Sequence, residues 1–136
     1  MKGNSCALLL LLIAANLGAS EPQISCEVGF SPGRAQELIL REIDGAKHEI
    51  LVAAYSFSSK PIADALDAAH KRGVVVKVVC EHKGNDKKAT IAYVLAARGV
   101  GVRLDGHYAI MHNKFRVFDG QTVQTGLFNL KRKMRR

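Results

Sequence analysis

The sequence lacks the features that mark several large classes of protein. Its three cysteines do not have the spacing of a zinc site, and the chain contains no internal repeats and no low-complexity linkers. Beyond residue 20, apolar runs such as 51–54 and 74–79 have only the length of a strand, whereas a membrane-spanning helix needs about 20 apolar residues. These absences argue against a repeat array, a zinc module and a membrane domain in this part of the chain.

The first 20 residues have the composition of a secretory signal. Lys2 gives a positive start, residues 7–15 form a short apolar run, and the small residues at 18–20 allow cleavage before Glu21. We therefore expect a signal peptide at 1–20 and a periplasmic or secreted protein; an uncleaved membrane anchor is the alternative. Cleavage would leave 116 residues, enough for one domain with a real core and too few for two. We place this domain at 21–130.

Two cysteines, Cys26 and Cys80, remain after the signal. An even pair in an oxidising compartment allows a disulfide, but the separation of the two Cα atoms cannot be read from the sequence. Two buried free thiols are the alternative, and the sequence leaves both open.

The formal net charge of +8 is concentrated at one end of the chain. Without Lys2 the protein has 19 basic and 12 acidic residues, and five of the basic ones lie in the tail at 131–136. The body is therefore close to neutral. A basic tail can hold nucleic acid nonspecifically by releasing counterions from phosphates, and a solvated terminus without a role is the alternative.

Strands and helices are expected to alternate along the chain. Ser31 and Pro32 have the residue types of a helix cap and first turn, and further helices are expected from Ser59 to Gly73 and over 90–97. Strands are expected over 48–54, 74–79, 100–104, 114–118 and 122–125. This order predicts an α/β sandwich with a mainly parallel sheet, helices on its faces and a late antiparallel hairpin. Residues 55–59 follow a central strand, where such sheets bind ligands; ordinary packing of Tyr55 and Phe57 is the alternative.

The segment at 112–120 carries the main chemical signal. Alternate side chains of a strand share a face, so His112 and Lys114 would set an imidazole beside an ammonium. An imidazole can attack phosphorus or transfer a proton, and a lysine can hold anionic oxygens. The alternative is a solvated edge strand that ends in a hairpin turn at Asp119-Gly120.

The wider run at 108–129 resembles the HKD motif of the phospholipase D superfamily, and in particular its small bacterial endonucleases with one motif per chain. Residues 27–32, 52–63 and 72–79 also match. The resemblance implies a metal-independent phosphodiesterase without cofactor, in which one histidine forms a phosphohistidine and a second protonates the leaving group. It assigns the catalytic roles to His112, Lys114 and Asp119 and phosphate binding to Lys114 and Asn129. One motif per chain implies a homodimer with two-fold symmetry. Nucleic acid is the expected substrate and membrane lipid a less favoured one.

Two departures from this pattern bear on activity. Leu127 stands where the family has a small hydroxyl residue. The leucine adds bulk beside the expected site and lacks the hydrogen-bond donor of the hydroxyl. The family also continues with a helix, a strand and an acidic residue that orients the histidine, so we expect a truncated member. An inactive remnant that binds nucleic acid is one alternative. Another is a metal-dependent hydrolase built from the following residues, which lack a recognised ligand spacing: Asp105, His107, His112 and Asp119.

Overall fold

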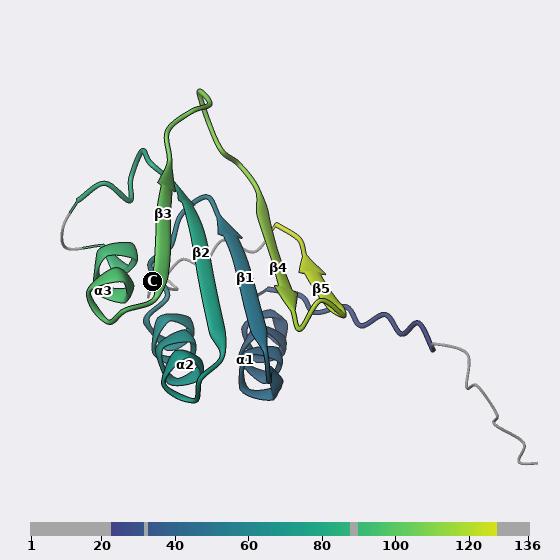
Figure 1. The fold of residues 1–136 in the computed structure, drawn as a ribbon. Helices are drawn as coiled ribbons and strands as arrows, with labels where there is room; N and C mark the ends of the chain where they lie inside the picture. Colours follow the sequence, from purple (N-terminus) through teal and green to yellow (C-terminus); the bar gives the residue numbers. More distant parts are fainter. Residues whose placement is uncertain (1–22, 32, 88–89, 128–136) are drawn as a thin grey trace, which may run out of the picture.

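A computed structural model describes residues 23–31, 33–87 and 90–127 (Figure 1). The expected signal peptide, Asn129 and the basic tail lie outside these residues. The elements in chain order are α1 (Ala35–Gly45), β1 (Glu49–Ala54), α2 (Lys60–Lys71), β2 (Val75–Glu81), α3 (Ile91–Ala97), β3 (Gly101–Asp105), β4 (Lys114–Phe118) and β5 (Thr122–Thr125). No helix within the described ranges is long and apolar enough to cross a membrane.

The five described strands form one sheet in the order β3-β2-β1-β4-β5. β1 pairs in parallel with β2, and β2 with β3. β4 runs antiparallel to both β1 and β5, so it alone is reversed. The structure thus confirms the predicted α/β class, with a mostly parallel sheet and a late antiparallel hairpin.

The core lies between the sheet and its three described helices, which occupy the same face (Figure 1). Alternation along the strands sends every second side chain to this face. The largest of these buried side chains come from all three helices and from β1 and β2, and they are Ile39, Ile43, Ile62, Leu66, Leu95, Ile50 and Val78. This packing fixes the register of the strands whose ends carry the candidate site.

The opposite face of the sheet carries no helix from the described residues. Val75, Val79, Phe115 and Val123 point to it and are 50%, 38%, 41% and 66% exposed. The helices in the described part of the chain therefore cover one face of the sheet. Among the strands of residues 23–31, 33–87 and 90–127, the central strand β1 is the one largely buried on both sides, as its apolar run predicted.

The boundaries of most elements agree with the sequence prediction to within about two residues. The exception is α1, which begins at Ala35 rather than at Ser31-Pro32. Gly33 has a φ of 150°, which no right-handed helix contains, so the helix can begin only after it. β2 also extends to Glu81, which brings an acidic side chain to the end of a buried strand.

Cys26 and Cys80 are both free. Cys80 is buried in the core and Cys26 is exposed, so neither the disulfide nor the pair of buried thiols is found. Burial raises the pKa of the Cys80 thiol to about 12, because an apolar surrounding disfavours the thiolate.

Candidate active site

The candidate site lies at the carboxyl end of β1, where β4 begins. Lys114 is the first residue of β4 and pairs with Ala54, the last residue of β1. His112 lies two residues earlier, at the end of the loop that connects β3 to β4 and rises beyond the sheet (Figure 1). The edge formed by the carboxyl ends of parallel strands is where open α/β sheets bind their ligands.

His112 and Lys114 are held together by their own backbone and by one aromatic ring. The Nζ of Lys114 donates a hydrogen bond to the carbonyl of His112 at 3.0 Å. The Tyr55 ring meets the His112 ring edge-on at a centroid distance of 4.7 Å, and the Lys114 Nζ lies 5.4 Å from the centre of the same ring. Tyr55 therefore forms a wall that both side chains share, whereas Phe57 is buried in the core.

The exposures of these two side chains differ in a way that suits their chemistry. His112 is exposed, whereas Lys114 is only 8% exposed. A buried ammonium is costly unless it is compensated, and here it faces a carbonyl and an aromatic ring. An ammonium has three N–H donors, and the bond to His112 occupies one. This arrangement can present an accessible imidazole and a fixed positive charge to one phosphate.

Asp119 lies at the far end of β4. Asp119 comes five residues after Lys114, which corresponds to about 16 Å of extended chain at about 3.3 Å per residue. Its carboxylate accepts the backbone N–H groups of Lys47, His48 and Glu49 at 2.8, 2.8 and 2.9 Å. These hydrogen bonds lower the pKa of Asp119 to about 2.

The backbone explains why an aspartate stands at this position. Asp119 and Gly120 have φ values of 52° and 66°, as a type I′ hairpin turn requires, and Asp-Gly is a favoured pair for that turn. Asp119 thus joins the hairpin to the start of β1. The structure does not bring it to His112 and Lys114, and it shows the turn role that the sequence left as the alternative.

Sequence reasoning missed Glu81, the last residue of β2. Its side chain is 1% exposed, and it accepts the backbone N–H of Lys83 at 3.1 Å and that of Met111, the residue before His112. These bonds, with that to Met111 first, lower the pKa of Glu81. The available signal was an acidic residue directly after an apolar strand, at the sheet edge where ligands bind.

Asn85, also missed, is a second buried polar residue at this edge. Its Nδ2 donates to the carbonyls of Tyr55 at 3.0 Å and Glu81 at 2.8 Å, and its Oδ1 accepts the N–H of Phe57 at 3.4 Å. It therefore connects the segment after β1 to the end of β2. An asparagine in a polar loop has no distinctive sequence pattern, so only the fold reveals this role.

None of the other described histidines, His48, His70, His82 and His107, has a ring contact with His112. His48 is beside Asp119 at the opposite end of the sheet, and His70 lies in α2. The His107 ring packs edge-on against Tyr108 at 4.9 Å, and the backbone N–H of His107 donates to the carboxylate of Asp105. None of the ring contacts found in the described ranges joins a second histidine to His112.

The metal-site alternative is not supported by the arrangement of its residues. Asp119 lies at the far end of the sheet from His112, so the four residues are not gathered. Across residues 23–31, 33–87 and 90–127, no group of three His, Cys, Asp or Glu side chains could hold a metal ion.

Leu127, which was expected to add bulk beside the site, is 93% exposed. Its side chain therefore points to solvent rather than packing against His112. The position of Asn129, the expected phosphate ligand, lies outside the described residues.

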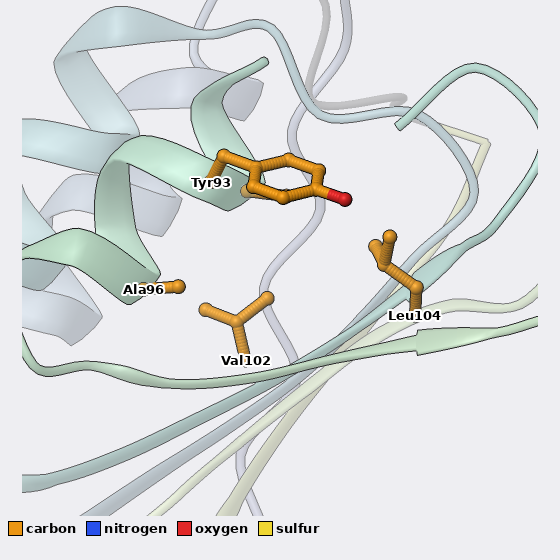
Figure 2. A pocket seen from close by; sticks show the side chains of 5 residues that line it. Tyr93, Ala96, Val102 and Leu104 are labelled. Atoms are coloured by element: carbon orange, nitrogen blue, oxygen red, sulfur yellow. The ribbon is translucent and has the colours of Figure 1, made fainter. Parts of the chain in front are cut away.

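An apolar hollow of about 170 Å³ lies between α3 and β3 (Figure 2). Tyr93 and Ala96 line it from the helix, and Val102 and Leu104 from the strand. Leu104 and Lys114 stand in one row of paired residues across the sheet. Three strand spacings of about 4.8 Å separate them by about 14 Å, so the hollow is distinct from the candidate site.

Comparison with protein families gives one match over most of the chain. A family model described as "Cardiolipin synthase, PLD-like domain" matches residues 39–135. The mitochondrial cardiolipin hydrolase of Drosophila melanogaster is 32% identical over 108 residues, which are 78% of this chain and 42% of that protein. The phospholipase D of Rickettsia typhi is 32% identical over 98 residues, 72% of this chain and 48% of that protein. The chain thus spans about half the length of these relatives or less.

Solved structures give the same fold. The crystal structure of Nuc from Salmonella typhimurium, a phospholipase D family member, matches with a TM-score of 0.72 and 44% identity, over 77% of this chain and 71% of that chain. NucT from Helicobacter pylori matches with a TM-score of 0.63 and 24% identity, over 71% of this chain and 67% of that chain. At the lower identity the likeness concerns the fold alone.

Proposed function

The chain belongs to the phospholipase D-like family, and from this premise we propose that it is a phosphodiesterase that cleaves nucleic acid without a metal, through a phosphohistidine on His112. One observation carries the proposal. An exposed imidazole and a nearly buried ammonium share the Tyr55 ring at the carboxyl end of β1. Few other tasks need a nucleophile and a fixed cation side by side at a ligand-binding edge.

In the first step, an imidazole nitrogen of His112 forms a bond to phosphorus and the bond from phosphorus to the leaving oxygen breaks. Lys114 holds the non-bridging oxygens, whose charge it offsets. The leaving oxygen takes a proton from a second imidazolium, because one ring cannot attack phosphorus and donate that proton at once. In the second step water attacks phosphorus, the second imidazole takes the proton of the water, and the bond to His112 breaks.

A second copy of the chain supplies the second imidazole most simply. In a two-fold dimer each surface patch meets its own copy, so two exposed His112 side chains can face one phosphate. The described histidines of the same chain have no contact with His112 that would replace it. The active species is therefore a homodimer.

Nucleic acid is the favoured substrate for two reasons. The fold is similar to that of Nuc at 44% identity, and the tail at 131–136 adds five basic residues that can bind phosphates. The composition of residues 1–20 supports a periplasmic or secreted location for this activity.

A phospholipid is the second candidate substrate. The relatives named phospholipase D and cardiolipin hydrolase favour it, as do the exposed Tyr108 and Ile110 on the loop before His112, since aromatic and aliphatic side chains can enter a lipid interface. The same two-step chemistry would act on either diester.

Nicking of supercoiled plasmid DNA in excess chelator tests the proposal. The wild-type chain and His48→Ala are expected to nick, because His48 lies at the opposite end of the sheet, and His112→Ala is expected to be inactive. Cardiolipin vesicles under the same conditions test the second substrate. Loss of nicking in chelator that divalent ions restore would contradict the mechanism, and DNA binding without cleavage would identify an inactive member.

A further inference from the structure

Glu81 is a buried carboxylate that the proposed mechanism does not use. It is 1% exposed, and it takes part in none of the ion pairs found within the described ranges. Burying a charge is costly unless hydrogen bonds compensate it. Two backbone N–H groups do so, and they come from loops about 30 residues apart in sequence, at Lys83 and Met111.

The bond to Met111 acts next to the proposed nucleophile. Met111 is itself buried and directly precedes His112. A hydrogen bond from its N–H fixes the peptide unit between Ile110 and Met111, just before His112 at the end of the loop that rises beyond the sheet (Figure 1). Lys83 adds a bond from its Nζ to the carbonyl of Ala109 at 3.3 Å, so the end of β2 holds this loop at two points.

The same strand end also positions the ring that contacts His112. The backbone carbonyl of Glu81 accepts Asn85 Nδ2, which donates in turn to the carbonyl of Tyr55. Tyr55 touches both His112 and Lys114. Glu81 is thus bonded on one side to the backbone before His112 and on the other to the segment that carries its aromatic neighbour.

We propose that Glu81 is a positioning residue for His112: its carboxylate sets the direction in which the imidazole meets the phosphate. The inference rests on the proposed function of His112. Glu81 should affect the attack of His112 on phosphorus and not the binding of the phosphate, because Lys114 and not Glu81 holds the phosphate. Loss of alignment should therefore lower kcat and leave KM nearly unchanged.

The test compares Glu81→Gln with Glu49→Gln. Both changes remove one negative charge and keep the size of the side chain, but Glu49 lies at the opposite end of the sheet, where its carboxylate is 3.6 Å from Lys77. A glutamine at 81 presents an NH₂ to one of the two N–H groups that now donate to it. With bis(p-nitrophenyl) phosphate as substrate, Glu81→Gln is expected to lower kcat about tenfold or more and to change KM less than about twofold. Glu49→Gln should match the wild type.

Glu81→Asp keeps both acceptor oxygens on a shorter stem and should recover part of the lost kcat. An unchanged kcat in Glu81→Gln would overturn the inference. A fall in kcat that is fully explained by a smaller folded fraction, measured by circular dichroism at the assay temperature, would also overturn it. In that case Glu81 would serve only the stability of the fold.

Nuclear magnetic resonance decides the matter even if the wild-type chain cleaves nothing. A wild-type chain without cleavage activity would defeat the proposed function. Glu81→Gln should still move the His112 Cε1–H signal and speed hydrogen exchange at the Met111 amide. Glu49→Gln should change neither. Wild-type signals at both positions in folded Glu81→Gln would refute the positioning role independently of activity.

Discussion

The Tyr55 ring offers the sharpest prediction about the site, because it contacts His112 and Lys114 at once. Tyr55→Leu removes the ring and keeps an apolar side chain. The cation–π contact of Lys114 contributes about 0.5–2 kcal/mol at such a site, and the edge-on contact with the imidazole about 0.5–1.5 kcal/mol. Because the two share one ring and are not strictly additive, we expect a combined loss of about 1–2 kcal/mol. This corresponds to a fall in kcat/KM of about 5- to 30-fold.

Tyr55→Phe is the matched control, since it keeps both ring contacts and removes only the hydroxyl. It should stay within about twofold of the wild type in kcat/KM on bis(p-nitrophenyl) phosphate. The assay should run in chelator with thermal midpoints measured alongside. If Tyr55→Phe loses as much as Tyr55→Leu, the hydroxyl and not the ring is important, and if neither loses activity, the shared wall has no functional role.

Three further predictions follow from single residues. The pKa of the Asp119 carboxylate is lowered from 3.8 to about 2, so this group contributes stability above about pH 4 that is lost as the pH falls toward 2. The wild type should therefore have a higher thermal midpoint than Asp119→Asn at pH 7, and the difference should shrink in acid. Cys26 should react with a thiol reagent in the folded protein and Cys80 only on unfolding, and equal rates would contradict their placement. Leu127→Ser should change kcat/KM little, because the side chain is exposed, and a large gain would place it at the site.

The sequence predicted local features well where a single strand or turn decides them. The strands at 114–118 and 122–125 agree with β4 and β5, because alternation and the Asp119-Gly120 turn both act within the hairpin. By contrast, strand alternation does not account for the neighbourhood of His112 and Lys114, because His112 lies in the loop before β4. The two residues meet through the His112 carbonyl and the Tyr55 ring. The α/β class followed from the order of elements.

Features that depend on distance through space could not be read in this way. The family motif placed Asp119 with the catalytic residues, but the length of β4 carries it to the other end of the sheet. The bond from Glu81 to Met111 joins residues 30 apart and ends on a backbone N–H, which no residue type reveals. The burial of one sheet face could not be predicted either, since apolar residues on β2 point to both faces and only one face meets helices.

The phosphohistidine on His112 is the central claim, and trapping it is the most direct measurement. A reaction of the 136-residue chain with a labelled diester in chelator, quenched in alkali because the phosphorus–nitrogen bond is labile in acid, should leave label on the peptide that contains His112. His112→Ala should carry none, and His48→Ala should carry as much as the wild type. Cleavage that proceeds without label on that peptide, or label that appears elsewhere, would contradict the account.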